Sequence, residues 1–326
     1  MPYRCSIYGL GVVANRAIPG VPPSTILSED VRISFGSLPA WLDVSDAQVE
    51  TSYVAEYKSE CGEPALRVLR VLDGGYYRFC YADRTEFVVD QAGTEVWAEW
   101  SAPLTLEDTA TYLLGPVMGF VMMLRGVVCL HASAVAIGNE AVALVGAAGS
   151  GKSTTAAAFA EHGYGVLAED VVTIDDRHDR FLVRPGYPCI RLWPSSVKAL
   201  YGSEDYLPKL TPNWDKCYLD LSEQFQGEPL PLAAIYQLGE RRHDGRAPFI
   251  ETLDRAASLM SLIANTYATK LMDKQMRARE FELLTRVLSH VPVRRVTPNA
   301  DPSRINELCD CILNDFSRRL PGVMQI

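Results

Sequence analysis

Between residues 142 and 154 the chain reads Val142-Ala-Leu-Val-Gly146-Ala-Ala-Gly149-Ser-Gly151-Lys152-Ser153-Thr154. This run fits G-x-x-x-x-G-K-[ST], in which glycines let backbone N–H groups turn inward around phosphate oxygens. An apolar run, Ala141 to Val145, precedes the glycines, and an Ala-rich run, Thr154 to His162, follows them. The pattern therefore predicts a strand, a phosphate-binding loop and a helix, in that order.

Each part of this loop has an expected role. The amides and the positive end of the following helix favour bound phosphate. Lys152 would reach the β- and γ-phosphates, and the Ser153 hydroxyl would hold Mg²⁺. The residues expected to bind the nucleotide are Gly146, Ala147, Ala148, Gly149, Ser150, Gly151, Lys152, Ser153 and Thr154.

The overall composition excludes some classes of partner. The 326 residues are 48% hydrophobic and carry a net charge of −9, enough chain for one large domain or two smaller ones. A nucleic-acid binder would show a basic stripe. Arg241-Arg242 and Arg294-Arg295 are too short for one. We therefore expect no nucleic-acid partner.

The cysteines and the apolar segments indicate a cytoplasmic protein. The eight cysteines are scattered, and Cys309-Asp-Cys311 lacks a second pair to complete a zinc site, so we expect free thiols. The N-terminus has no long apolar signal core. The stretch Leu113 to Leu124 contains Gly115-Pro116 and is too short to span a membrane.

The first part of the chain, residues 1–103, is expected to form a β-rich domain without a chemical motif. Its apolar runs are separated by turns, with a loop from Ile18 to Ser28 and a hairpin signal at Asp73-Gly74-Gly75. The expected strands are Tyr3–Val13, Val31–Phe35, Ala65–Leu72, Tyr76–Tyr81, Glu86–Val89 and Thr94–Trp97.

Residues 104–326 are expected to form an α/β nucleotide-binding domain, because helical and strand-like patterns alternate there. A helix should begin at the capping box of Thr105 and Asp108 and stop at Gly126. Residues 186–228 look irregular. The other expected elements are strands at Val127–Ile137, Gly165–Ile174, Arg180–Arg184, Ala233–Leu238 and Pro292–Val296, and helices at Asp254–Thr266, Lys270–His290 and after Asp301-Pro302.

A second group of candidate residues is the pair Glu169-Asp170, inside the apolar run Gly-Val-Leu-Ala-Glu-Asp-Val-Val. Adjacent carboxylates at the end of a strand point to opposite faces, so we expect different roles for them. One would bind the metal held by Ser153, and the other would face the acceptor. The alternative is two solvated acids, although charges inside an apolar run need a reason.

His131 is the third candidate, because it interrupts an apolar strand that directly precedes the loop strand. A lone histidine in such a strand is more often a hydrogen-bonded core residue. If the two strands are neighbours, however, His131 lies near the phosphate end of the loop and can tune a carboxylate.

Together these segments resemble the HPr kinase/phosphorylase family and its shorter relatives. The matching runs are His131-Ala-Ser-Ala-Val, Val145-Gly-Ala-Ala-Gly-Ser-Gly-Lys152-Ser153 and Gly163-Tyr-Gly-Val-Leu-Ala-Glu169-Asp170-Val-Val. The likeness covers residues 113–200 well and the last third loosely. Tyr187-Pro-Cys-Ile-Arg191-Leu-Trp-Pro and the β-rich first part look like relatives that include serine kinases of lasso-peptide precursors.

The resemblance implies a fold shared with phosphoenolpyruvate carboxykinase and a reaction in which ATP, with Mg²⁺, phosphorylates a serine hydroxyl of a peptide or protein. By position, Glu169 matches the base, Asp170 its neighbour at the metal, and His131 the histidine beside the base. Two departures leave points open. Glu169 replaces the usual aspartate, so either acid can be the base. Cys189 stands where bifunctional relatives carry a glutamate, which leaves the reverse, phosphate-removing activity open.

Arg184 and Arg191 are candidates to hold the product phosphate or an acidic substrate. The stretch from Tyr206 to Lys216 is either a substrate flap or an ordinary surface loop. Two other functions remain open from the sequence: a kinase for a small molecule on the same scaffold, and a non-catalytic scaffold regulated by nucleotide.

Overall fold

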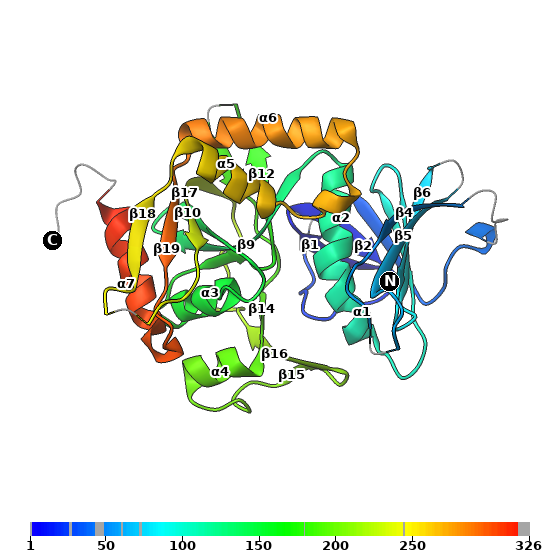
Figure 1. Cartoon of the computed structure of the whole chain (residues 1–326). Coiled ribbons are helices and arrows are strands. Elements are labelled where there is room, and N and C mark those ends of the chain that lie inside the picture. Colours follow the sequence, from blue (N-terminus) through cyan, green and yellow to red (C-terminus); the bar gives the residue numbers. More distant parts are fainter. Residues whose placement is uncertain are drawn as a thin grey trace. The chain divides into compact units, whose positions relative to one another are not determined.

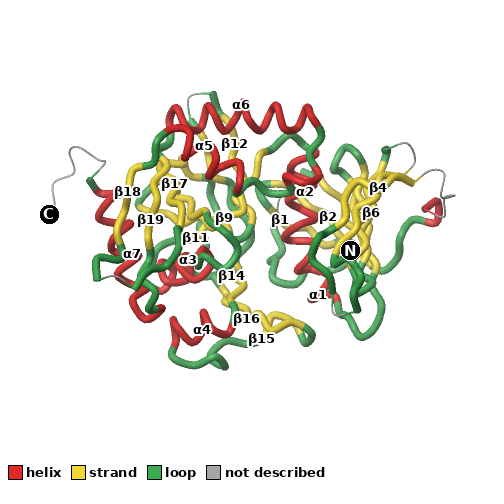
Figure 2. The backbone as a smooth tube through the Cα atoms, in the orientation of Figure 1, coloured by secondary structure: helices red, strands yellow, loops and turns green. Residues whose placement is uncertain are grey.

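The computed structural model describes residues 2–25, 28–42, 49–59, 61–71, 74–178, 180–243 and 245–318 (Figures 1 and 2). Its secondary structure is mixed α/β, in two compact units. Unit 1 comprises Met1–Val127, Thr211–Asn213 and Tyr267–Ala278, and unit 2 comprises Val128–Leu210, Trp214–Thr266 and Arg279–Ile326.

Unit 1 contains an eight-stranded sheet in the order β1-β2-β3-β8-β7-β6-β5-β4. The strand β3 pairs in parallel with both β2 and β8, and the other neighbouring pairs are antiparallel. The bounds are β1 Tyr3–Ile7, β2 Leu10–Ala14, β3 Val31–Phe35, β4 Val49–Val54, β5 Leu66–Val71, β6 Tyr76–Tyr81, β7 Glu86–Asp90 and β8 Glu95–Glu99, with short helices η1 Ala40–Leu42 and η4 Thr269–Leu271.

The strands expected in the first hundred residues are confirmed, with two exceptions. The run from Tyr3 to Val13 is a hairpin, because Tyr8 and Gly9 adopt positive φ and turn the chain. The strand β4 was not expected. Ile26, Leu27 and Asp73, which fall in the expected loop and hairpin turn, lie outside the described residues.

The helical segment after Thr105 starts as expected but is not continuous. The capping box between Thr105 and Asp108 is present, and the chain turns at Gly126 with φ +78°. Between them lie α1 (Leu106–Tyr112), a π-helical turn η3 (Leu113–Val117) and α2 (Met118–Leu124). Pro116 lies inside η3, and proline cannot donate a helical hydrogen bond, so the regular α-helix is interrupted there.

This helical segment belongs to unit 1, so the division between the units falls after Val127 and not at the expected 103/104 boundary. The reason is packing: the ring of Phe120 on α2 makes edge-to-face contacts with Tyr77 and Phe79 of the sheet, at 4.8 and 5.2 Å between centroids. The Tyr8 hydroxyl also donates to the Leu114 carbonyl at 2.6 Å.

Unit 2 is built on a second eight-stranded sheet, in the order β10-β9-β12-β13-β17-β19-β18 with β11 beside β9. The strand β10 also pairs in parallel with β17, and β17 pairs in parallel with β19. The bounds are β9 Val128–Ile137, β10 Glu140–Val145, β11 Val166–Ala168, β12 Val171–Asp176, β13 Phe181–Val183, β17 Leu230–Leu238, β18 Phe249–Thr252 and β19 Val293–Thr297.

Helices cover both faces of this sheet (Figure 1). Alternate residues of β10 face opposite ways, so Val142 and Leu144 pack in one core with α3 (Lys152–Glu161) and α7 (Ile305–Ser317). Ala141, Ala143 and Val145 pack in the other core with α5 (Arg255–Ala264) and α6 (Lys274–His290). A short helix, η5 (Pro302–Arg304), leads into α7.

Residues 186–228 are more regular than the sequence indicated. They contain β14 (Cys189–Leu192), α4 (Pro194–Tyr201), β15 (Lys209–Thr211) and β16 (Trp214–Asp220), and the three strands form a small sheet. The expectation of an irregular region was wrong because Pro194 starts a helix at its first position, where proline is tolerated.

The strand expected over Gly165–Ile174 is in fact two strands, β11 and β12, and β18 was not expected. The other strands and helices of this part lie where the sequence placed them, within a few residues at their ends, although Asp179 lies outside the described residues. Within the described ranges, no helix is long and apolar enough to cross a membrane.

Candidate active site

The glycine-rich loop connects β10 to α3, the arrangement that its sequence motif requires. Two glycines are needed for steric reasons. A Cβ on Gly146, at φ +153°, would lie 2.9 Å from the Leu238 carbonyl oxygen. Gly151 precedes α3 with φ +104°, a conformation that favours glycine. The loop therefore brings its backbone close around the N-terminus of α3, where anions bind.

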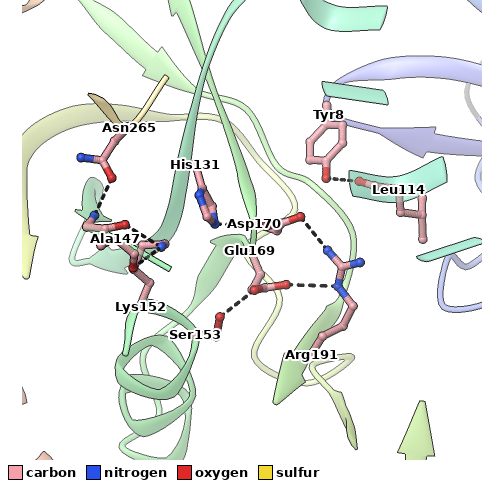
Figure 3. A network of polar contacts seen from close by, with 11 residues as sticks. Tyr8, Leu114, His131, Ala147, Lys152, Ser153, Glu169, Asp170, Arg191 and Asn265 are labelled. Carbon is pink, nitrogen blue, oxygen red and sulfur yellow. Dashed lines mark hydrogen bonds and ion pairs between the residues drawn. The ribbon is translucent and has the colours of Figure 1, made fainter. Parts of the chain in front are cut away.

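Lys152, the first residue of α3, points back into this loop (Figure 3). Its ammonium donates to the carbonyl oxygens of Gly146 and Ala147, at 2.8 and 3.2 Å. The side chain is buried, and burial lowers its pKa, while Asp170 and Glu169 oppose that shift. The cation is therefore held at the centre of the loop.

Glu169 and Asp170 lie in the break between β11 and β12 and not on one strand. Asp170 has φ +68°, and the Val171 N–H donates to the Glu169 carbonyl at 2.8 Å. This is a γ-turn with positive φ, which is uncommon and strained for a residue with a side chain. The expectation that a regular strand separates the two carboxylates onto opposite faces therefore does not apply.

Arg191 of β14 contacts both carboxylates. Its Nη2 donates to Asp170 Oδ2 at 2.9 Å, and its Nε lies 3.5 Å from Glu169 Oε2. Arg191 and Glu169 are almost completely buried, whereas the Asp170 side chain is 22% exposed. Because a buried carboxylate needs a partner, Arg191 keeps the two acids side by side.

Glu169 also contacts the loop helix. The Ser153 hydroxyl donates to Glu169 Oε1 at 2.7 Å. The structure thus places Glu169, and not Asp170, on Ser153, which differs from the order that the family resemblance implies. Burial raises the pKa of Glu169, and the Arg191 guanidinium opposes that shift.

His131 lies on β9, which pairs with both β10 and β12, and its direct partner on β12 is Val171. Its Nε2 is 3.5 Å from Asp170 Oδ1 (Figure 3). Burial lowers the pKa of His131, Asp170 opposes that shift, and Lys152 adds to it. The imidazole is therefore mainly neutral near pH 7, next to the more exposed of the two acids.

These groups line one pocket of unit 2, with a volume of about 720 Å³, inside the range of small-molecule sites. Of the two arginines proposed for the acceptor, Arg191 lines it, but Arg184 does not and instead pairs with Asp175 at 3.0 Å. Of the stretch 206–216, only Lys216 lines the pocket. Its ammonium lies 5.2 Å from the ring of Trp193, another lining residue.

Two site residues were not found from the sequence. Asn265, at the end of α5, accepts the Gly146 N–H on Oδ1 at 3.0 Å, while its backbone carbonyl accepts the His131 N–H at 2.7 Å. Arg241 lines the pocket, and its Nη2 would lie 2.9 Å from a Cβ on Gly151. Asparagine after a helix is a common cap, and Arg241-Arg242 is a short basic pair like Arg294-Arg295, so neither carries a distinct signal in the sequence.

The donor set near the loop fits a magnesium ion. Mg²⁺ in nucleotide sites takes one or two carboxylates and hydroxyls together with phosphate oxygens and water. Ser153 Oγ and Glu169 Oε1 supply two adjacent oxygens, and Glu169 Oε2 is buried without a hydrogen bond among the described residues. Within the same residues, no cluster of three or more metal-binding side chains is present. An ion here would therefore need oxygens from its nucleotide.

No protein-family model matches this chain, and no curated protein matches it. Among solved structures, it is similar to the HPr(Ser) kinase/phosphatase from Coxiella burnetii. That likeness has 12% sequence identity and a TM-score of 0.34, and it covers 59% of this chain and 92% of the other.

Proposed function

We propose that this chain is a cytoplasmic kinase that transfers the γ-phosphate of ATP to a serine hydroxyl of a peptide or protein. One observation carries the proposal. Side chains from α3, from the β11–β12 turn, from β9 and from β14 converge on one pocket beside the glycine-rich loop. These residues are Lys152, Ser153, Glu169, Asp170, His131 and Arg191.

Phosphoryl transfer mainly requires a protein to position the reactants and neutralise charge. Lys152 and the loop amides would bind the phosphates. Ser153 and Glu169 would hold Mg²⁺, because their oxygens are 2.7 Å apart. When bound, the metal supplies positive charge to the phosphate oxygens.

Asp170 is the better candidate for the base. It is the more exposed carboxylate, it faces the pocket, and it lies beside His131 and not on Ser153. In the proposed step Asp170 takes the serine proton while the hydroxyl oxygen bonds to the γ-phosphorus. The bond from that phosphorus to the β–γ bridging oxygen breaks, which leaves ADP.

The acceptor class is supported by the sequence resemblance to peptide-precursor serine kinases, so a ribosomally made peptide, such as a lasso-peptide precursor, is the proposed substrate. The test incubates the protein with Mg²⁺, γ-labelled ATP and degenerate peptide libraries that fix serine, threonine or alanine at the centre. We expect label in the serine library above the alanine library, and about 10²–10³ less label with Lys152→Ala.

Label that appears only in small hydroxyl compounds would replace the peptide kinase with a small-molecule kinase. Nucleotide binding without any transfer would instead indicate a regulated scaffold.

A further inference from the structure

The pocket extends well beyond the acidic pair. One end is formed by the charged side chains of Asp170 and Lys216 and by His131. The other end is bounded by α4 and by the segment from η5 into α7. Its walls carry the small and apolar side chains of Ser195, Ser196 and Ala199 from α4, and of Pro302, Ile305 and Leu308 from η5 and α7. Two charged residues of the same segment also line it: Asp301, which caps η5, and Arg304, which pairs with Glu307.

The loop gives this pocket a direction. In loops of this kind the lysine reaches the β- and γ-phosphates, and the next hydroxyl holds the metal. The γ-phosphate end is therefore the end with Lys152, Ser153 and Glu169. The nucleoside must leave the loop on the side away from these groups.

Thr154 marks where the nucleoside leaves. It is the residue after Ser153 on α3, and its hydroxyl donates to Ser196 Oγ on α4 at 2.8 Å. The helices α4 and α7 both contact α3, and α4 also contacts η5. The walls formed by α4 and by the η5–α7 segment therefore lie beside the nucleoside side of the phosphate loop.

A flat heteroaromatic ring is suited to such a slot, because ligand pockets bind rings mainly through apolar contact. The opposite end is less suitable, since its charged groups surround the acceptor position. The exposed Trp193 directly precedes α4 and lies beside Lys216, so it stands between the two ends.

We infer that the purine base of the nucleotide lies between α4 and the η5–α7 segment, and that Ala199 and Ile305 limit the space for it. This inference rests on the proposed function, because it assumes that the loop binds nucleotide phosphates.

The test compares two ligands by calorimetry in Mg²⁺ buffer: ATP, which has a base, and inorganic tripolyphosphate, which has none. Ala199→Phe should weaken ATP binding more than tenfold and leave tripolyphosphate binding within about twofold, because the new ring fills only the base slot. The matched control is Lys198→Phe, at the neighbouring exposed position that pairs with Glu204, and it should change neither affinity.

Ile305→Phe, from the facing wall, should repeat the pattern of Ala199→Phe, and thermal unfolding shows whether each variant is folded. The slot is overturned if folded Ala199→Phe and Ile305→Phe bind ATP as the wild type does, or if they lose both ligands. It is also overturned if Trp193→Ala, but neither Ala199→Phe nor Ile305→Phe, loses ATP affinity. If the wild type binds neither ligand, the proposed function itself fails.

Discussion

At the scale of single residues, the two carboxylates have different surroundings, so their substitution should change different kinetic parameters. Glu169 contacts Ser153, whereas Asp170 contacts His131. Asp170→Asn should lower kcat by about 10²–10⁴, the usual contribution of a general base, with ATP affinity nearly unchanged. Glu169→Gln should raise the Mg²⁺ concentration needed for half-maximal rate. The measurements are kcat and Mg²⁺ titrations for both variants.

The reverse pattern would restore the roles that the family resemblance implies. Wild-type rates in both variants would show that the pair is structural.

Arg241 and Arg242 provide a matched pair of arginines. Both are exposed, but only Arg241 lines the pocket, and no ion pair engages it among the described residues. A charge-assisted contact to phosphate contributes about 1.5–3 kcal/mol, so Arg241→Ala should weaken ATP binding at least tenfold. Arg242→Ala should not change it. Equal effects in calorimetry would mean that Arg241 does not contact the nucleotide.

His131 should make the stability of the protein depend on pH. Burial lowers its pKa from the ordinary 6.5, so the unfolded chain takes up a proton before the folded one as pH falls. The neutral imidazole therefore contributes its full stability above about pH 6.5. That contribution is lost as the pH falls from about 6.5 to the lowered pKa of the folded state. His131→Gln should flatten this acid-side loss in melting temperatures measured from pH 5 to pH 7.5. An unchanged slope would mean that other groups cause it.

At the scale of secondary-structure elements, α5 positions the loop through Asn265. This amide is buried, and its Nδ2 donates to the Ser261 carbonyl at 2.7 Å, which leaves Oδ1 to accept from Gly146. Asn265→Leu would leave a buried N–H unpaired, at a cost of about 1–3 kcal/mol. We expect lower stability and ATP affinity reduced at least fivefold. Asn314→Leu, at an exposed position of α7, is the control.

A purely structural role for Asn265 would lower the melting temperature and leave ATP affinity unchanged in the folded variant.

Elements were predictable where their chemistry is local. The capping box at Thr105 and the order of strand, loop and helix around Gly146 follow from neighbouring residues alone. The break at Asp170 was not predictable, because Val166–Asp176 is apolar enough to look like one strand. The turn instead depends on Arg191, a tertiary partner on another strand.

At the scale of the whole molecule, the sequence indicated a β-rich part and an α/β part divided at 103/104, whereas unit 1 continues to Val127. Unit 1 includes two short segments from the later chain, 211–213 and 267–278. They join it through contacts such as Asn213 Nδ2 with Asp108 Oδ2 at 2.7 Å and Lys270 with Glu56 at 3.2 Å. Such long-range contacts have no signature in local periodicity.

The central claim is that the loop around Lys152 binds ATP and transfers its γ-phosphate. The most direct test measures phosphate transfer by the wild type and by Lys152→Ala, at saturating ATP and Mg²⁺, onto the peptide that the library selects. Loss of a cation that stabilises the transferred group should lower the rate by about 10²–10³. Circular dichroism should match the wild type. A folded variant with a near-normal transfer rate would contradict the account.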